Sequence, residues 1–100
     1  MNFTDLTKKT KAAASVLRAV NNACRKKIVS VLMAHPGSDV QTLYKKRLKM
    51  EQSVCSQHLG ILRKAGIVIA TKDGKRRLYS VNEKRLAQIG MLSEELIKID

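Results

Sequence analysis

The chain has 100 residues, a length that can build one domain with one modest core but not two. Hydrophobic residues make up 44% of it, which favours a folded chain, and aromatic residues only 3%, which argues against stacking on single-stranded bases. With 20 Lys and Arg against 8 Asp and Glu, the net charge is +12, so we expect a polyanionic partner, nucleic acid first and an anionic membrane surface second.

The cysteine content and the hydropathy pattern indicate a compartment. Two cysteines, Cys24 and Cys55, are fewer than a disulfide-stabilised secreted domain of this size often carries. The sequence has no apolar run long enough to span a bilayer, and its N-terminus lacks the apolar core of a signal peptide. We therefore expect a cytoplasmic protein whose thiols are reduced.

The first third of the chain predicts two helices. Residues 4–18 favour the first helix, because Thr4 can cap it and several alanines follow without a breaker. Asn21 or Asn22 can then cap a second helix that runs to about Ala34. The His-Pro-Gly-Ser sequence that follows ends this helix, since proline removes a donor and glycine permits positive φ.

A short third helix is predicted over residues 40–47. Asp39 is a good N-cap for it, Leu43 is its apolar anchor, and cations at its C-terminal end complement the helix dipole. Residues 48–51 then form a tight turn. A short helix, a turn and a following helix with a polar outer face make a helix-turn-helix motif.

The fourth predicted helix, within residues 52–66, has two different faces. Spacings of three and four place on one face, mostly apolar, Cys55, His58, Leu59 and Leu62. The same period places on the other, acid-free face Ser53, Ser56, Gln57, Gly60 and Arg63 or Lys64. Small polar side chains allow a helix to enter the DNA major groove and to pair with base edges, although such a face is more commonly just solvated.

Beyond Gly66 the period changes from 3.6 to 2, and two strands are predicted over residues 67–72 and 76–81. Asp73-Gly74 predicts a type I′ hairpin between them. A lone hairpin is marginally stable, so we expect it to pack against the helices. Its tip is basic, which is typical of a wing that contacts phosphates or the neighbouring minor groove.

Asn82 can cap a last helix over about residues 83–99, which carries an apolar stripe at helical spacing. Little core remains to cover this stripe, so we expect a dimer seam shared with the first helix; the alternative is packing within one subunit. The expected interface residues are Leu6, Ala13, Leu17, Leu86, Ile89, Leu92 and Leu96. The predicted fold is a mainly α (α+β), single winged helix-turn-helix domain over residues 1–100, in the order four helices, two strands and a helix.

Three segments resemble the ArsR/SmtB-type winged-helix transcriptional regulators. Residues 53–68 are similar to the signature S-x-x-S-x-H-L-x-x-L-x-x-A-G-L-V, and residues 72–81 to the family's wing. Residues 17–29 are similar to the second-helix pattern, with Arg25 at its usual arginine, and the resemblance covers residues 12–99. It implies a homodimer that binds an inverted repeat and represses transcription, with its recognition helices about one helical turn, roughly 34 Å, apart.

The residues that family metal sensors use are missing. The third predicted helix has no Cys-x-Cys pair, residues 83–99 contain no His or Cys, and the only histidines are His35 and His58. Zinc or nickel needs three or four converging ligands, so we expect no metal and no cofactor. Cys24 follows a helix cap and precedes three cations, which favours thiolate and leaves a thiol or persulfide switch as an alternative to plain packing.

These observations name the candidate contact residues. For base reading they are Gln52, Ser53, Ser56 and Gln57. For phosphate contacts they are Lys45, Lys46, Lys49, Arg63, Lys64, Lys75, Arg76 and Arg77. The competing class is a non-specific architectural or RNA-binding module, which leaves the Ser/Gln face without a purpose. Membrane binding fits less well because the cations are spread over several elements, and no catalytic constellation can be assembled.

Overall fold

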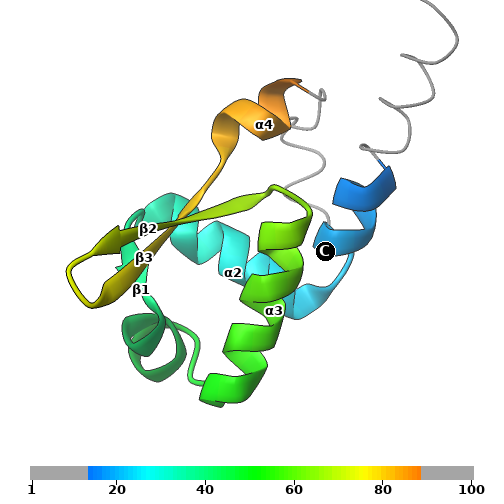
Figure 1. Cartoon of the computed structure of the whole chain (residues 1–100). Coiled ribbons are helices and arrows are strands. Elements are labelled where there is room, and N and C mark those ends of the chain that lie inside the picture. The colour runs from blue at the N-terminus through cyan, green and yellow to red at the C-terminus, as the bar shows by residue number, and fades with distance from the viewer. Residues whose placement is uncertain (1–13, 89–100) are drawn as a thin grey trace, which may run out of the picture.

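The computed structural model describes residues 14–88, which form several helices and one small antiparallel sheet (Figure 1). A helical segment over residues 14–20 comes first. It is followed by α2 (Ala23–Ala34), β1 (Ser38–Asp39), the π-helix η1 (Thr42–Arg47), α3 (Gln52–Lys64), β2 (Val68–Asp73), β3 (Arg76–Val81) and α4 (Glu83–Gln88). The architecture is a winged helix-turn-helix, as the sequence predicts: η1 and α3 are its two helices, and β2 and β3 are its wing.

Polar side chains start the helices where the sequence predicts. The side-chain oxygen of Asn22 accepts the backbone N–H three residues further on at 3.1 Å, and that of Asn82 does the same at 3.1 Å. Asp39 accepts the corresponding N–H at the start of the third helix at 2.7 Å. Each such cap stabilises its helix by about 1 kcal/mol. At the other end of α3, Gly66 adopts φ 79° and stops the helix.

The sheet has three strands, so the predicted order with two strands is incomplete. The strand order is β1-β3-β2, and β1 pairs antiparallel with β3 through Ser38 opposite Tyr79 and Asp39 opposite Leu78. Two residues are too few to show a period of two, and their partners lie 39 or more residues away, so no local pattern reveals β1. Its pairing attaches the wing to the residues that precede η1.

The third helix is present over the predicted residues, and most of it takes the π form. Only residues 40–41 have the α pattern, and η1 continues as a π-helix, in which the N–H of Leu48 donates to the carbonyl of Leu43, five residues back, at 2.8 Å. Both leucines are buried, with 6% and 0% exposure. Residues five apart lie far apart around an α-helix, so the wider π turn allows both side chains to face the core.

The predicted type I′ turn at Asp73-Gly74 is wrong in detail. Asp73 pairs with Arg76 at the end of the ladder, which leaves Gly74 and Lys75 as the two-residue loop. Gly74 has φ 64°, whereas Lys75 is not among the residues with positive φ. Glycine at the first loop position fits a type II′ turn, which suits the twist of a hairpin equally well.

The core is aliphatic and lies between the helices and the inner side of the sheet. Ile28 and Leu32 of α2 and Leu59 and Leu62 of α3 are at most 2% exposed, and Tyr79 of β3 closes the core from the sheet. Burying each large aliphatic side chain contributes about 1.5–3 kcal/mol. Within residues 14–88, no helix combines the length and the apolar composition needed to cross a membrane.

Candidate nucleic-acid interface

Helix α3 presents a buried face and an exposed face, as its periodicity predicts. Cys55, Leu59 and Leu62 are buried in the core, at 0%, 2% and 0% exposure. The four side chains predicted to read bases are all exposed, and these are Gln52, Ser53, Ser56 and Gln57. All four are uncharged hydrogen-bonding groups, so the outer face of α3 can donate to and accept from base edges.

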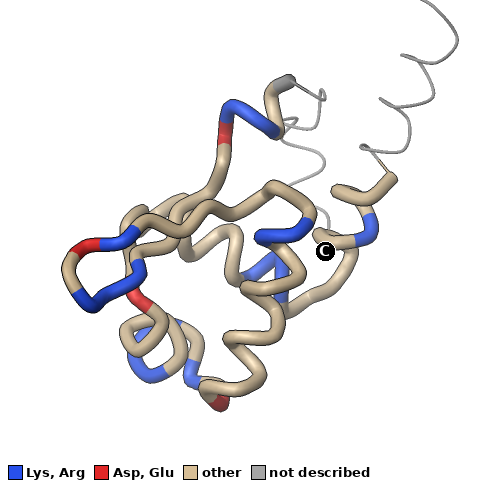
Figure 2. Tube along the Cα trace, in the orientation of Figure 1, with Lys and Arg blue, Asp and Glu red and all other residues tan. Residues whose placement is uncertain are grey.

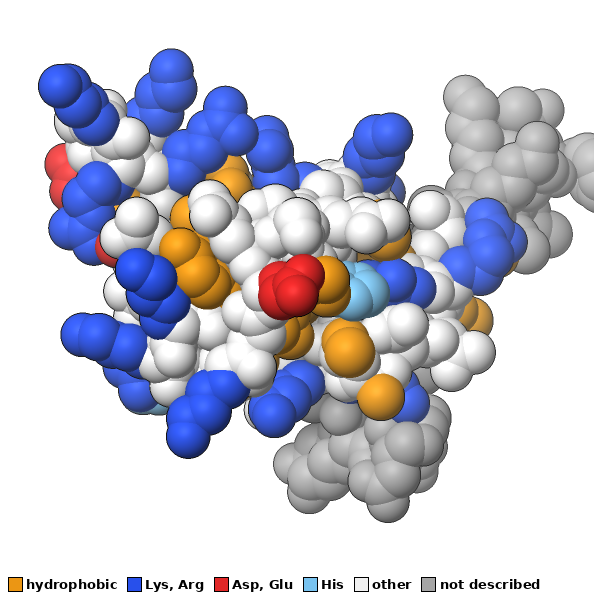
Figure 3. Space-filling model, turned by 90° about the horizontal axis from the view of Figure 1, so that it is seen from below, with side chains coloured by type: hydrophobic (Ala, Val, Ile, Leu, Met, Phe, Trp, Pro, Cys, Tyr) orange, Lys and Arg blue, Asp and Glu red, His pale blue; other side chains and the backbone are white. Residues whose placement is uncertain are grey.

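Basic side chains surround this polar face. The view from below shows Lys and Arg around the edge, and an acidic group near the centre among hydrophobic and white atoms (Figure 3). Along the backbone, cations gather at the wing tip, on η1 and at the end of α3 (Figure 2). Exposed among them are all eight predicted phosphate contacts, Lys45, Lys46, Lys49, Arg63, Lys64, Lys75, Arg76 and Arg77. A polyanion laid across this face would meet cations from η1, its turn and the wing.

Arg63 and Lys64 stand apart from the other predicted phosphate contacts. They lie in the last turn of α3, at the opposite end from Gln52. The 13 residues of this helix extend over about 20 Å. These two cations therefore cannot reach the phosphates that flank the first turn of α3, and any phosphate that they contact belongs to another part of the duplex.

Arg76 of the wing is held by Asp39, a contact that the sequence did not reveal. One oxygen of the Asp39 carboxylate pairs with the Arg76 guanidinium, and the other accepts the Thr42 N–H at 2.7 Å. These hydrogen bonds and the cation lower the pKa of Asp39 to about 2. The side chain of Arg76 is still 63% exposed. Asp39 thus connects the wing to the start of η1 and leaves part of the guanidinium open to solvent.

Lys49 adopts a strained backbone in the turn between η1 and α3. Its φ is 51°, and it is the one non-glycine residue with positive φ among residues 14–88. A left-handed conformation costs a side-chain-bearing residue roughly 1–2 kcal/mol. The N–H of Met50 donates to the carbonyl of Tyr44 at 3.0 Å and closes this turn. The strain places an exposed lysine between the two helices of the motif.

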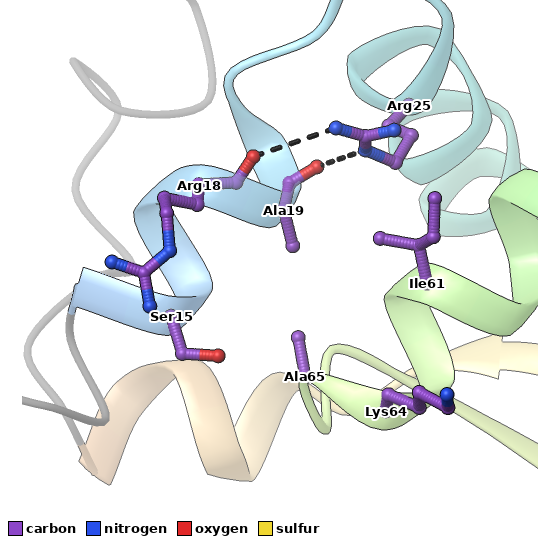
Figure 4. Close-up of a pocket in the computed structure, with 7 residues that line it drawn as sticks. All are labelled: Ser15, Arg18, Ala19, Arg25, Ile61, Lys64 and Ala65. Carbon is purple, nitrogen blue, oxygen red and sulfur yellow. Dashed lines mark hydrogen bonds between the residues drawn. The ribbon is translucent and has the colours of Figure 1, made fainter.

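Arg25 connects three helices through its guanidinium. It donates to the carbonyls of Ala19 and of Arg18, the latter at 3.5 Å, and so caps the end of the helical segment over residues 14–20 (Figure 4). Its Nη1 also lies 3.3 Å from Nδ1 of His58 on α3. Because arginine can only donate, His58 must accept at Nδ1. Arg25 and His58, which both belong to the segments that resemble the family, therefore lie at one junction of helices. Arg25 also lines a hollow of about 340 Å³ (Figure 4).

Gly60 lies in the middle of α3, at a position where the packing of the chain does not require a glycine. A Cβ built at this position would have no neighbouring atom within 4 Å. Glycine in a helix interior is about 1 kcal/mol less favourable than alanine. The sequence placed Gly60 on the polar face but gave no indication that the fold tolerates a larger residue there.

The two cysteines occupy different environments. Cys24 is exposed at the start of α2, and Cys55 is fully buried in the core. Burial raises the pKa of the Cys55 thiol, so this cysteine acts as a small apolar side chain. In the described part of the chain, no three His, Cys, Asp or Glu side chains gather as metal ligands would.

Two of the predicted interface residues lie within the described part of the chain. Leu17 is 41% exposed, which suits a contact with a second copy, whereas Leu86 is 4% exposed and packs into the core of the single chain. The remaining five lie outside residues 14–88, and these are Leu6, Ala13, Ile89, Leu92 and Leu96.

Known proteins with similar sequences and structures indicate the class of protein to which this chain belongs. No family model matches the chain. An HTH-type transcriptional regulator of Methanocaldococcus jannaschii is 36% identical over 88 residues, which are 88% of this chain and 98% of the relative. The structure of the transcriptional regulator HlyU from Vibrio vulnificus has 32% sequence identity and a TM-score of 0.66, and the alignment covers 92% of this chain and 95% of HlyU.

A third similarity concerns the fold alone. The homodimeric winged helix-turn-helix DNA-binding domain from Mycobacterium bovis has a TM-score of 0.75 at 20% identity, over 92% of this chain and 83% of that domain. Together, the fold and the relatives define a DNA-binding transcriptional regulator, a class of protein that is not an enzyme. More narrowly, the chain belongs to the HTH-type transcriptional regulators that these two relatives represent. An ArsR-like transcriptional regulator from Rhodococcus shares its fold, with a TM-score of 0.74 at 23% identity, over 81% of this chain and 74% of that one.

Proposed function

We propose that the protein is a homodimeric repressor that binds an inverted-repeat operator in double-stranded DNA. The observation that carries this proposal is the set of four exposed, uncharged polar side chains on the first two turns of α3, Gln52, Ser53, Ser56 and Gln57, with exposed cations on the neighbouring elements. A non-specific binder would need the cations but not the amide and hydroxyl groups. The proposal therefore explains both features of this surface.

Base reading is assigned to the first two turns of α3. The Gln57 amide can donate its N–H to N7 of adenine and accept the N6 amino hydrogen with its carbonyl oxygen, a bidentate pair that suits this base edge. Ser53 and Ser56 can pair with several bases. Gln52 begins the helix, where it can contact either a base or the backbone. Each good bidentate pair contributes about 1–3 kcal/mol of discrimination against a wrong base.

Phosphate binding is assigned to the basic side chains around that face. Lys45 and Lys46 end η1, Lys49 lies in the turn, and Lys75, Arg76 and Arg77 belong to the wing. Each neutralised phosphate should steepen the dependence of log K on log salt by about 0.9. These contacts supply affinity for any duplex and set the position from which α3 reads the bases.

The homodimer is assigned to the terminal helices. The exposure of Leu17 and the homodimeric state of the similar M. bovis domain support it. Two-fold symmetry would then place the two α3 helices about 34 Å apart, one turn of DNA. The protein would act in the cytoplasm, with neither a metal nor a cofactor as its effector.

Selection of bound sequences from random duplex DNA tests this function. Purified, reduced protein at near-physiological salt should enrich an inverted repeat whose half-sites are spaced by about one helical turn. Tight, salt-sensitive binding without enrichment would instead support the non-specific architectural reading. A single enriched half-site would contradict the dimer but keep sequence-specific reading.

A further inference from the structure

An open groove runs between α3 and β2, one of the two edge strands of the sheet. Its volume is about 560 Å³. Its lining residues are Gly60, Arg63 and Lys64 of α3 and Val68, Ile69 and Ala70 of β2. Arg63, Lys64 and Ile69 are exposed, and the six lining residues include two cations and no acid. The groove is therefore positive along one border, and its exposed apolar residue, Ile69, can contact the carbon atoms of a sugar.

The groove lies between the two elements that the proposed function assigns to DNA. That function places α3 in a major groove and the wing tip at the adjacent minor groove. In a duplex, one sugar–phosphate strand separates a major groove from the neighbouring minor groove, so this strand has to pass between the two elements. Strand β2 leads from the groove to the wing tip; it carries Lys72 and ends at the exposed Asp73, and Lys75 follows in the turn.

Gly60 gives this groove a place where another backbone can come close. The residue has neither a positive φ nor a crowded Cβ position, so the fold itself does not require glycine. Glycine nevertheless lowers the stability of a helix relative to alanine. A glycine that the folded chain does not need is explained if a ligand must approach the helix backbone at that point.

We propose that the groove between α3 and β2 holds the sugar–phosphate strand that separates the two DNA grooves. Gly60 is the point of closest approach, and Arg63 and Lys64 bind phosphates of that strand. This inference rests on the proposed function and adds to it a second DNA contact, on later turns of α3 than the base-reading residues. It also gives Arg63 and Lys64 a target that lies away from the first turn of α3.

Replacement of Gly60 by Ala in the full chain tests the proposal, because it should change stability and DNA binding in opposite directions. The melting temperature should rise by about 4 °C, since alanine favours the helix. The dissociation constant for duplex DNA should rise about tenfold, since the added methyl group keeps the strand away from the helix. The larger Gly60→Gln should weaken binding further.

Ser30→Ala is the matched control. Ser30 is an exposed residue in the middle of α2 and does not line the groove, and this change also improves helix propensity. It should raise the melting temperature slightly and leave the dissociation constant unchanged within twofold. Arg63→Ala and Lys64→Ala should each weaken binding severalfold and reduce the salt slope by about 0.9.

Two results would overturn the inference. One is a Gly60→Ala protein that binds DNA as tightly as the wild type, and the other is a Gly60→Ala protein that melts at a lower temperature. Because the contact is with the backbone, the loss should also appear with random duplex. A wild type that enriches no operator would refute the proposed function, while the Gly60 measurement on random duplex would still decide whether a strand occupies the groove.

Discussion

At the scale of single residues, base reading and phosphate binding should be separable. Gln57→Ala should weaken binding to the selected operator by about 1–3 kcal/mol and relax the preference at one base pair, because it removes an amide that we propose to pair with a base edge. Lys75→Ala should weaken operator and random duplex equally and lower the salt slope by about 0.9. Competition binding with both duplexes at several salt concentrations measures the two effects. Equal losses on both duplexes for Gln57→Ala would refute base reading by this residue.

Asp39 gives the second prediction at this scale, a dependence of stability on pH. Its pKa is lowered from 3.8 to about 2 in the folded chain, so its contribution is fully present above pH 3.8 and is lost as the pH falls toward 2. Asp39→Asn keeps a capping oxygen but loses the charge that pairs with Arg76. The unfolding free energy should fall by about 0.5–1 kcal/mol at pH 7, and the difference from wild type should shrink below pH 4.

Urea denaturation between pH 2 and pH 7 measures this difference. Asp73→Asn is the control, since it removes an equal charge from an exposed residue of the same wing. A difference between wild type and Asp39→Asn that stayed constant across this pH range would show that the Asp39 carboxylate does not stabilise the fold through its charge.

At the scale of elements, Arg25 should stabilise the junction of three helices. Arg25→Ala removes the donors that bind the carbonyls of Arg18 and Ala19 and the contact with His58. The expected loss is about 1.5–3 kcal/mol, as for hydrogen bonds from a charged group. Arg18→Ala is a matched control, because Arg25 binds the backbone of Arg18 and not its side chain. Thermal melts should show a large loss for the first variant and a change within about 0.5 kcal/mol for the second.

The elements also show what a sequence can predict. Helices α2 and α3 and both wing strands follow from periodicity, and the starts of α2 and α4 follow from the caps Asn22 and Asn82, which act locally. Strand β1 is too short to have a period, and the π-form of η1 results from burying Leu43 and Leu48 together. Both features depend on the packed core, which no local pattern describes.

The candidate site likewise has features that the sequence predicts and features that only the tertiary structure reveals. The exposed face of α3 was predicted from spacing alone, because a helix converts spacing directly into faces. The pairs Asp39–Arg76 and Arg25–His58 join residues 37 and 33 positions apart, so only the tertiary structure reveals them. The meaning of Gly60 likewise depends on the empty space around it.

At the scale of the whole molecule, DNA affinity should depend on dimerisation. Leu17→Glu places a charge on a leucine that is 41% exposed in the single chain, so it should leave the fold intact and separate the two copies. Operator affinity should fall more than tenfold, because a monomer reads one half-site and loses the second set of contacts. Sedimentation equilibrium and operator titration measure both effects.

Met33→Glu provides the comparison. Met33 is 37% exposed on α2 and is outside the predicted interface, so this variant should remain dimeric and bind the operator normally. If Leu17→Glu were also dimeric with unchanged affinity, Leu17 would not belong to the interface. If both variants became monomeric, the interface would be larger than the terminal helices.

The two faces of α3 have a consequence for how such a regulator can change over evolutionary time. Cys55, Leu59 and Leu62 hold the helix in the core, whereas Ser53, Ser56 and Gln57 contribute nothing to that core. Exposed positions of this kind tolerate substitution with little change in stability. A duplicated copy of this protein could therefore acquire a new target sequence through a few substitutions while its scaffold stayed the same.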